Sequence, residues 1–209
     1  MTKIAILVSG SGSNMMAVIE AVEARALDAR VVVVISSNSG AGALIKAKAH
    51  GIETVVCALE DTPPDITKLH LRREARDGMI VSKLNETGAE LVVLAGYLGI
   101  LTPELINTYE GRIINIHPSL LPKHGGVGMY GINVHKSVIE AGDEVSGATV
   151  HYVVDDVDGG EIILQRECEV LPSDTPEILQ QRVLNTVEHS LLVDAIRLVL
   201  DKKQIVSSQ

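Results

Sequence analysis

The chain has 209 residues, of which 46% are hydrophobic, 22% are charged and only 2% are aromatic, with no Phe or Trp. This composition favours a globular protein with an aliphatic core and leaves few rings on which single-stranded nucleic acid could stack. The formal net charge of −9 disfavours a polyanionic partner, although it does not exclude a single phosphate group. We therefore expect one domain over residues 1–209 and no nucleic-acid partner, while the oligomeric state stays open.

The chain also lacks the signals of export and of membrane insertion. No apolar run reaches 18 residues, and no basic segment with a cleavage site precedes the first strand-like stretch. Cys57 and Cys168 lie in apolar stretches, which favours buried thiols over a disulfide or a metal pair. We expect a cytoplasmic protein without a membrane partner.

Apolar runs of strand length alternate with helical patterns over the first two thirds of the chain. The runs are Lys3–Val8, Arg30–Ser36, Thr54–Cys57, Leu91–Ala95 and Ile113–His117. The helical patterns are Asn14–Ala24, Ala41–His50, Leu69–Thr87 and a short one near Pro103–Thr108. Continuous Val, Ile and Leu content is typical of parallel strands buried on both faces. The pattern predicts an α/β fold with a doubly wound, mostly parallel sheet, helices on both faces, and ligands at the carboxyl ends of the strands.

The last third of the chain follows a different pattern. Two strand-like stretches, Gly147–Val154 and Glu161–Val170, are separated only by "DDVDGG", which is too short for a crossover helix. We expect these strands to run antiparallel. A long amphipathic helix is predicted from about Pro176 to Leu200.

A glycine turn, "VSGSGSN", follows the first predicted strand and opens the first predicted helix. Gly10 and Gly12 allow a tight turn, and Ser13 or Asn14 is expected to cap the helix. Free amides at a helix start bind phosphate well, but an ordinary capped turn would look the same. Met15 stands where a dinucleotide fingerprint needs its third glycine, which disfavours a nicotinamide dehydrogenase.

The stretch "NIHPSLLP", residues 115–122, carries an amide and an imidazole at the end of the fifth predicted strand. Asn115 and His117 are two residues apart, so they face the same side of the strand. Together they could stabilise an oxyanion and transfer a proton. A histidine bonded to the backbone beside a turn asparagine is the simpler alternative.

The acids before the last glycine pair, in "DDVDGG", fit either a solvated turn or a functional role. Asp158, directly before the glycines, is the best placed to approach another loop. A carboxylate near His117 would fix the tautomer of its ring and raise its pKa. The other histidines show no metal-ligand spacing, so we expect no metal. The serines of "VSGSGSN" do not form a supported nucleophile elbow.

Taken together, "GSGSN", "LAGYLGIL", "NIHPSLLP" and the final "DGG" occur in an order that resembles the phosphoribosylglycinamide formyltransferase family of purine synthesis. The resemblance runs from about Lys3 to Leu200 and is highly specific for the folate-dependent formyltransferase fold. It implies formyl transfer from 10-formyltetrahydrofolate, as co-substrate, to the amine of glycinamide ribonucleotide. The implied transfer is direct, through a tetrahedral intermediate, and needs no metal.

The resemblance also assigns roles by position. Asn115 and His117 match the catalytic Asn and His of the family, and Asp158 matches the Asp that supports the His. The remaining matches are Gly12, Ser13, Asn14 and Glu188 for the ribonucleotide, and Arg73, Leu98, Gly99, Ile100, Leu101 and Asn115 for the folate.

Some positions depart from the family pattern. Gly99 stands where many relatives have Arg, which affects a folate contact. The stretch "KHGGVGMYGINVH" is longer and richer in glycine than usual. The segment between Arg182 and Glu188 has one residue more than the family pattern.

Three other functions remain as alternatives. A methionyl-tRNA formyltransferase shares the "NIHPSLLP" chemistry, but its added domain does not fit in 209 residues and −9 is a poor charge for tRNA. A formyltetrahydrofolate hydrolase would carry an N-terminal regulatory domain. A non-catalytic folate or nucleotide binder would not need Asn115, His117 and Asp158 together.

Overall fold

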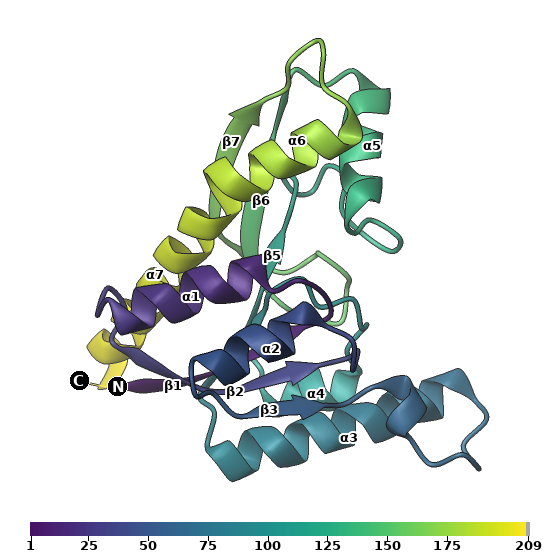
Figure 1. Ribbon diagram of the computed structural model, residues 1–209, viewed down its shortest axis with the longest axis vertical. Coiled ribbons are helices and arrows are strands. Elements are labelled where there is room, and N and C mark those ends of the chain that lie inside the picture. The colour runs from purple at the N-terminus through teal and green to yellow at the C-terminus, as the bar shows by residue number, and fades with distance from the viewer. Residues whose placement is uncertain (208–209) are drawn as a thin grey trace.

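Seven strands form one sheet in the computed structural model, which describes residues 1–207 and the side chains of residues 1–202 (Figure 1). The strands are β1 (Thr2–Val8), β2 (Ala29–Ser36), β3 (Thr54–Val56), β4 (Leu91–Leu94), β5 (Ile113–His117), β6 (Val145–Tyr152) and β7 (Ile162–Glu169). Their order in the sheet is β3-β2-β1-β4-β5-β6-β7. The first five strands pair in parallel, whereas β6 pairs antiparallel with both β5 and β7. The predicted fold class and the antiparallel pair are confirmed.

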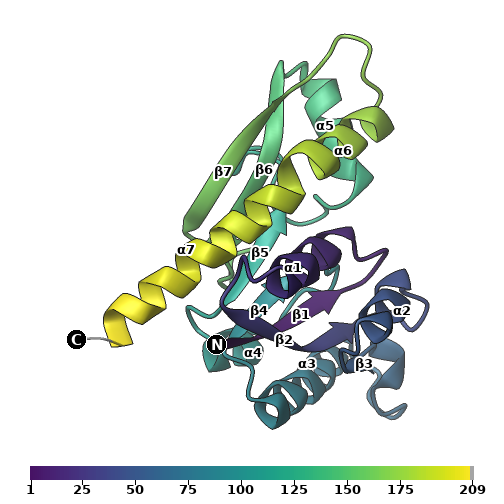
Figure 2. The same cartoon turned by 60° about the vertical axis from the view of Figure 1, so that its left-hand side comes forward.

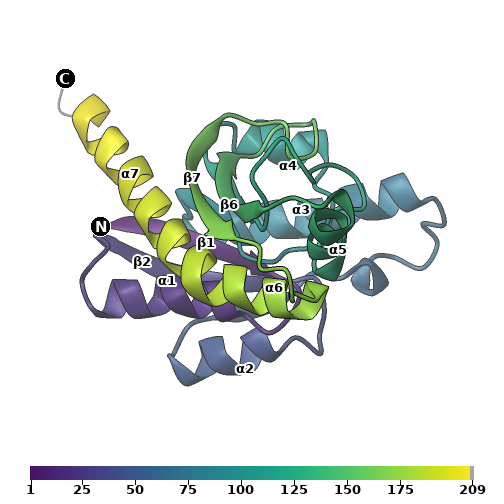
Figure 3. The same cartoon turned by 90° about the horizontal axis from the view of Figure 1, so that it is seen from above.

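Helices cover both faces of this sheet (Figure 3). They are α1 (Ser13–Glu23), α2 (Gly42–Ala49), α3 (Leu69–Thr87), α4 (Pro103–Thr108), α5 (Ile132–Ala141), α6 (Pro176–Val183) and α7 (His189–Ser207), with a 3-10 turn, η1, at Leu59–Asp61. Alternate residues of β1 point to opposite faces, so Ile4 and Ile6 pack in one core cluster and Ala5 and Leu7 in the other. The first cluster contains residues of α1, α2, α6 and α7, and the second contains residues of α3 and α4.

The strand order places the switch point of the fold between β1 and β4. The chain runs outward from β1 to β2 and β3, and then returns to the other side of β1 through β4 and β5. In such sheets the loops after the two central strands separate and leave a crevice at their carboxyl ends. The segments after β1, β4 and β5 therefore meet at one site.

The C-terminal helix differs from the predicted helix of Pro176 to Leu200. It has three parts, α6, a π-helical segment at Leu184–Glu188 named η2, and α7 (Figure 2). A π turn accommodates one extra residue in an otherwise α-helical rod. The extra residue between Arg182 and Glu188 is therefore taken up inside the helix, and the flanking parts keep their apolar faces on the sheet.

Helix α5 was not predicted. It begins at Ile132, directly after a glycine-rich segment in which Gly126, Gly128 and Gly131 have positive φ angles. The glycines conceal the helical pattern, because only Val134 and Val138 supply its buried apolar face. The long segment after "NIHPSLLP" is thus a shorter loop followed by a helix.

Candidate active site

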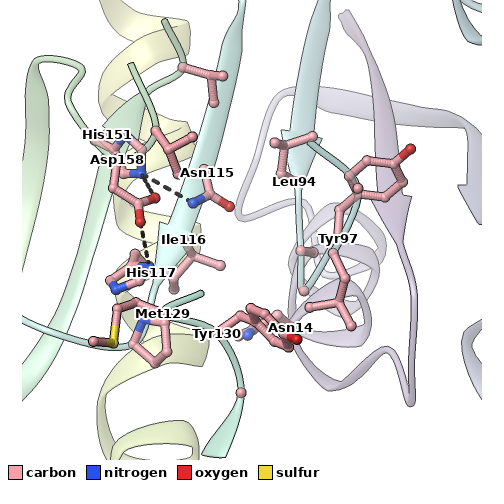
Figure 4. A pocket seen from close by; sticks show the side chains of 18 of the residues that line it. Asn14, Leu94, Tyr97, Asn115, Ile116, His117, Met129, Tyr130, His151 and Asp158 are labelled. Atoms are coloured by element: carbon pink, nitrogen blue, oxygen red, sulfur yellow. Dashed lines mark hydrogen bonds and ion pairs between the residues drawn. The ribbon is translucent and has the colours of Figure 1, made fainter. Parts of the chain in front are cut away.

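A pocket of about 720 Å³ lies at the carboxyl ends of β1, β4 and β5 (Figure 4). Its wall is made of residues 10–14 after β1, residues 94–101 at the end of β4, and residues 115–118 at the end of β5. The loop before α5, the β6–β7 turn and the α6–η2 segment complete the lining. The pocket therefore contains every predicted site residue except Arg73.

Asn115 and His117 lie on the same side of β5 and both line the pocket. His117 is buried, with 4% of its surface exposed, whereas Asn115 is partly exposed. The Nδ2 atom of Asn115 lies 3.1 Å from Nε2 of His151. Because an amide nitrogen carries two hydrogens, one N–H of Asn115 remains for a ligand.

Asp158 approaches the two β5 side chains from the β6–β7 turn (Figure 4). Its Oδ2 lies 3.4 Å from Nδ1 of His117, and its Oδ1 lies 3.6 Å from Nε2 of His151. The residue has a φ of 60°, in the left-handed region that residues other than glycine seldom adopt. Its Oδ2 also accepts a hydrogen bond from the N–H of Gly126 at 2.9 Å, which ties the turn to the loop before α5.

The environment of this group shifts two pKa values. Burial lowers the pKa of His117 below its ordinary value, while the Asp158 carboxylate and the carbonyl of His124 oppose that shift. The sequence predicted a raised pKa, so the net direction was wrong, although the effect of Asp158 itself has the predicted sign. Burial alone would raise the pKa of Asp158, but His151, His117 and the amide of Gly126 together bring it below its ordinary range.

The tautomer of His117 is set by a contact that the sequence did not reveal. Its Nε2 lies 2.9 Å from the backbone carbonyl of His124, so Nε2 carries a proton. The nitrogen that gains or loses a proton is then Nδ1, which faces Asp158. His124 has a φ of 53°, and its ring is held by Ser137 at 2.7 Å and Asp143 at 2.8 Å.

His151 is the functional candidate that the sequence did not single out. It lies on β6, and the antiparallel register places it directly opposite Asn115. Its Nδ1 donates to the carbonyl of Tyr152 at 2.9 Å, which leaves Nε2 as an acceptor for the Asn115 amide when the ring is neutral. Only the pairing register of β5 and β6 could have identified it.

The turn after β1 is fixed by packing as well as by backbone conformation. Gly12 has a φ of 75°, and a Cβ atom at this position would lie 2.6 Å from Cβ of Ala43 on α2. The predicted side-chain cap by Ser13 or Asn14 was wrong, because Gly12 occupies the N-cap position and no side chain bonds there. The helix start therefore lines the pocket without a hydrogen bond from a capping side chain.

The side chain of Asn14 instead bonds to the end of the π-helical segment. Its Nδ2 donates to Oε2 of Glu188 at 2.6 Å, and its Oδ1 is buried without a partner among the described residues. Glu188 is 7% exposed and lines the pocket. Burial raises the pKa of this carboxyl to about 7, and the bond from Asn14 only partly offsets that effect. The π turn thus delivers a carboxyl group that titrates near neutrality.

Replacing Glu188 by Gln should stabilise the protein at alkaline pH. A folded-state pKa above the ordinary value of 4.5 means that Glu188 favours folding below pH 4.5, and that this contribution is lost as the pH rises through about 7. The variant should therefore melt at a higher temperature than the wild type at pH 8, with a much smaller difference at pH 5. Thermal unfolding at both pH values tests this. Glu104→Gln, the same substitution at an exposed position, is the matched control.

Residues Leu98 to Leu101 form the part of the pocket wall that follows β4. Leu98 and Ile100 are exposed to the extent of 58% and 41%, and Gly99 is partly exposed. Within residues 1–207, no hydrogen bond engages the backbone N–H of Gly99, Ile100 or Leu101. These groups are available to a ligand that presents hydrogen-bond donors and acceptors along one edge.

Arg73 lies on α3 outside the pocket lining. Its side chain makes no hydrogen bond or ion pair with any residue that the structure describes. The side chain is partly exposed and therefore available to an anionic group that extends beyond the pocket.

The described residues hold neither a metal-binding group nor a membrane-spanning helix. Within residues 1–207, His, Cys, Asp and Glu side chains do not gather in groups of three or more that could hold a metal ion. Over the same range, each helix is too short or too polar to cross a membrane.

The comparisons with known proteins agree on one family. A family model for formyl transferases matches residues 2–196. The chain is 37% identical to the phosphoribosylglycinamide formyltransferase of Haemophilus influenzae over 182 residues, which covers 87% of this chain and 80% of that protein. It is 36% identical to the chloroplastic phosphoribosylglycinamide formyltransferase of Arabidopsis thaliana over 96% of this chain, and it spans 66% of the length of that relative, just under two thirds.

The fold comparison leads to the same group. The crystal structure of glycinamide ribonucleotide transformylase 1 from Symbiobacterium toebii superposes with a TM-score of 0.87 and 35% sequence identity, covering 97% of this chain and 89% of that one. The family match over nearly the whole chain, the relatives and the fold all agree with the resemblance in the sequence motifs. The chain belongs to the formyl transferase family, in its phosphoribosylglycinamide formyltransferase group.

Proposed function

We propose that this protein transfers the formyl group of 10-formyltetrahydrofolate to the amine of glycinamide ribonucleotide, as an enzyme of purine synthesis in the cytoplasm. The observation that carries the proposal is the convergence of Asn115, His117 and Asp158 on one wall of a pocket. That pocket extends from a helix start suited to phosphate, at α1, to a wall with free backbone amides, at Leu98–Leu101.

The ribonucleotide would occupy the end of the pocket near α1. The amides of Gly12, Ser13 and Asn14 lie at the N-terminus of an 11-residue helix, where the helix dipole favours a phosphate. The buried Oδ1 of Asn14 and the carboxyl of Glu188 then offer acceptors for hydroxyl groups of the sugar. The Nδ2 atom of Asn14 already donates to Glu188, so a bound ligand would meet a preorganised pair of side chains.

The folate would occupy the opposite end. The unbonded amides of Gly99, Ile100 and Leu101 can hold the polar edge of its ring, and the apolar side chains of Leu98 and Ile100 can cover a ring face. Arg73, on α3 beyond the pocket, is placed to pair with the carboxylates of the folate tail. The formyl group would then lie between the two substrates, beside Asn115.

The chemistry is an acyl transfer. The amine nitrogen attacks the formyl carbon, and the carbonyl oxygen becomes an oxyanion. The spare N–H of Asn115 and the charged ring of His117 would stabilise that oxygen, for which His117 must exchange its bond to the His124 carbonyl. The bond from the formyl carbon to the folate nitrogen breaks, and the proton lost by the amine passes to that nitrogen. Asp158 favours the charged ring and can order a water for the transfer.

An acceptor competition tests this function. Purified protein would be mixed with 10-formyltetrahydrofolate and, separately, with glycinamide ribonucleotide, charged methionyl-tRNA or buffer alone, and tetrahydrofolate release would be followed. Formylation only of the ribonucleotide is the expected result. Release in buffer alone would instead indicate a hydrolase, formylation of tRNA would indicate the other transferase, and binding without release would indicate a non-catalytic binder.

Asn14→Leu should raise the Michaelis constant for the ribonucleotide while leaving folate binding nearly unchanged. The substitution removes the amide that orients Glu188 and the acceptor Oδ1 at the phosphate end of the pocket. Steady-state kinetics with each substrate varied in turn would measure both constants. Asn107→Leu, on an exposed face of α4, is the matched control. A fall in folate affinity with an unchanged ribonucleotide constant would show that the loop serves the other ligand.

A further inference from the structure

The loop after β4 is held at alternate residues by polar groups from beneath it. The hydroxyl of Ser9 accepts from the N–H of Leu98 at 2.8 Å, at the start of the loop. Nη2 of Arg76 donates to the carbonyl of Ile100 at 2.7 Å, and Oδ2 of Asp77 accepts from the N–H of Thr102 at 2.6 Å. Residues 98–101 of this loop line the pocket, and the N–H groups of Gly99, Ile100 and Leu101 stay unbonded among the described residues. The loop is therefore set from its rear side.

Arg76 and Asp77 are buried charges whose energetic cost requires an explanation. They are 2% and 1% exposed, and Asp77 Oδ1 lies 2.7 Å from Nε and 2.6 Å from Nη2 of Arg76. Buried ion pairs add little net stability, because desolvation offsets their attraction. Their value lies instead in geometry, since a planar guanidinium fixes several acceptors at once. Here the pair spans the pocket loop from Ile100 to Thr102.

The same guanidinium explains why position 99 carries no side chain. A Cβ atom on Gly99 would lie 2.8 Å from Nη1 of Arg76 and 2.7 Å from Cε1 of Tyr97, both closer than real contacts allow. The backbone of Gly99 does not need glycine for its conformation, because its φ angle is not positive. In this structure the glycine is therefore required by space, which the Arg76 guanidinium and the Tyr97 ring occupy. The guanidinium lies over that ring, with 5.9 Å between Cζ of Arg76 and the ring centre.

We infer that Arg76 and Asp77 are positioning residues for the folate wall, and that Gly99 is the residue that lets the guanidinium lie against the back of that wall. The inference rests on the proposed function for the identity of the ligand. Neither charged residue lines the pocket, so neither contacts the substrate. They act by holding the backbone amides of Gly99, Ile100 and Leu101 at fixed positions.

The test measures ligand binding and turnover separately in Gly99→Ala and Arg76→Lys. The lysine can still pair with Asp77 but cannot hold Asp77 and the Ile100 carbonyl in one plane. Both variants should weaken binding of a 5,8-dideazafolate analogue about tenfold in calorimetry and raise the Michaelis constant for the formyl-folate to the same extent. The constant for the ribonucleotide and the turnover number at saturation should stay within about twofold of the wild type.

A matched glycine and a double variant complete the design. Gly78→Ala lies on the same helix beside Asp77, and its added Cβ would meet nothing within 4 Å, so it should bind the analogue as the wild type does. Adding Gly99→Ala to Arg76→Lys should weaken analogue binding less than Gly99→Ala does in the wild type. One of the two groups that the new Cβ strikes, Nη1 of Arg76, is then absent, and only the Tyr97 ring remains.

Specific outcomes would overturn the inference. Wild-type affinity for the analogue in folded Gly99→Ala would show that the wall does not depend on this contact. Fully additive losses in the double variant would show that Arg76 does not impose the requirement for glycine. Equal rises in both Michaelis constants would indicate general loosening of the fold. Because the analogue is measured by binding, these results stand apart from any failure of the transfer assay.

Discussion

Variants Asn115→Ala and His117→Ala should each lower the turnover number by about 10²–10³-fold, the usual cost of one lost oxyanion donor. Both side chains line the pocket from one side of β5. Asn115 is held by His151, and His117 has to exchange its bond to the His124 carbonyl for one to the oxyanion. Because the two donors serve the same oxygen, the double variant should lose less than the product of the single effects. Single-turnover transfer rates with both substrates saturating would measure these losses.

The fold should survive both changes. His117→Ala removes a buried ring, so circular dichroism and thermal unfolding must show a cooperative transition for the variant. His70→Ala is the matched control, because that histidine lies fully outside the pocket at the exposed start of α3. Turnover near that of the wild type in folded His117→Ala would remove the histidine from the proposed mechanism.

The strands and the position of the site follow from local patterns, which explains why they could be predicted. β5, α3 and α4 have the predicted bounds, and a Pro or Gly interrupts the pattern at one end of each: Pro118 after β5, Gly88 after α3 and Pro103 at the start of α4. Residues that are two apart on a strand share a face, so the common direction of Asn115 and His117 could be predicted without tertiary information. The approach of Asp158 was also foreseen, since a "DGG" turn joins two antiparallel strands beside β5.

What could not be predicted depends on register and on contacts between distant segments. The position of His151 opposite Asn115 is set by the pairing of β5 with β6. The sequences of the two strands do not show which residues pair. The one-residue excess before Glu188 was visible, but only the structure shows that a π turn absorbs it. The burial that lowers the pKa of His117 likewise comes from the whole surrounding fold, and it outweighs the carboxylate that the sequence suggested.

Asp158→Asn should lower the pKa of His117 further and reduce the transfer rate with it. Burial already lowers this pKa, and the carboxylate 3.4 Å from Nδ1 is the largest contribution that opposes the shift. Because Nε2 keeps its proton on the His124 carbonyl, the charge of the ring depends on Nδ1. Removing the carboxylate destabilises the charged ring, so the charged fraction at a given pH above the pKa falls about tenfold for each unit of further shift.

Two measurements separate the charge of Asp158 from its shape. The ring-proton NMR shift of His117 would be titrated in the wild type, in Asp158→Asn and in Asp156→Asn, which removes the same charge from an exposed position of the same turn. Single-turnover rates would be recorded at the same pH values. The pKa should fall clearly only in Asp158→Asn, and the rate at alkaline pH should fall in proportion to the charged fraction. A lower rate with an unchanged His117 titration would mean that Asp158 acts by ordering water for proton transfer and not by stabilising the imidazolium.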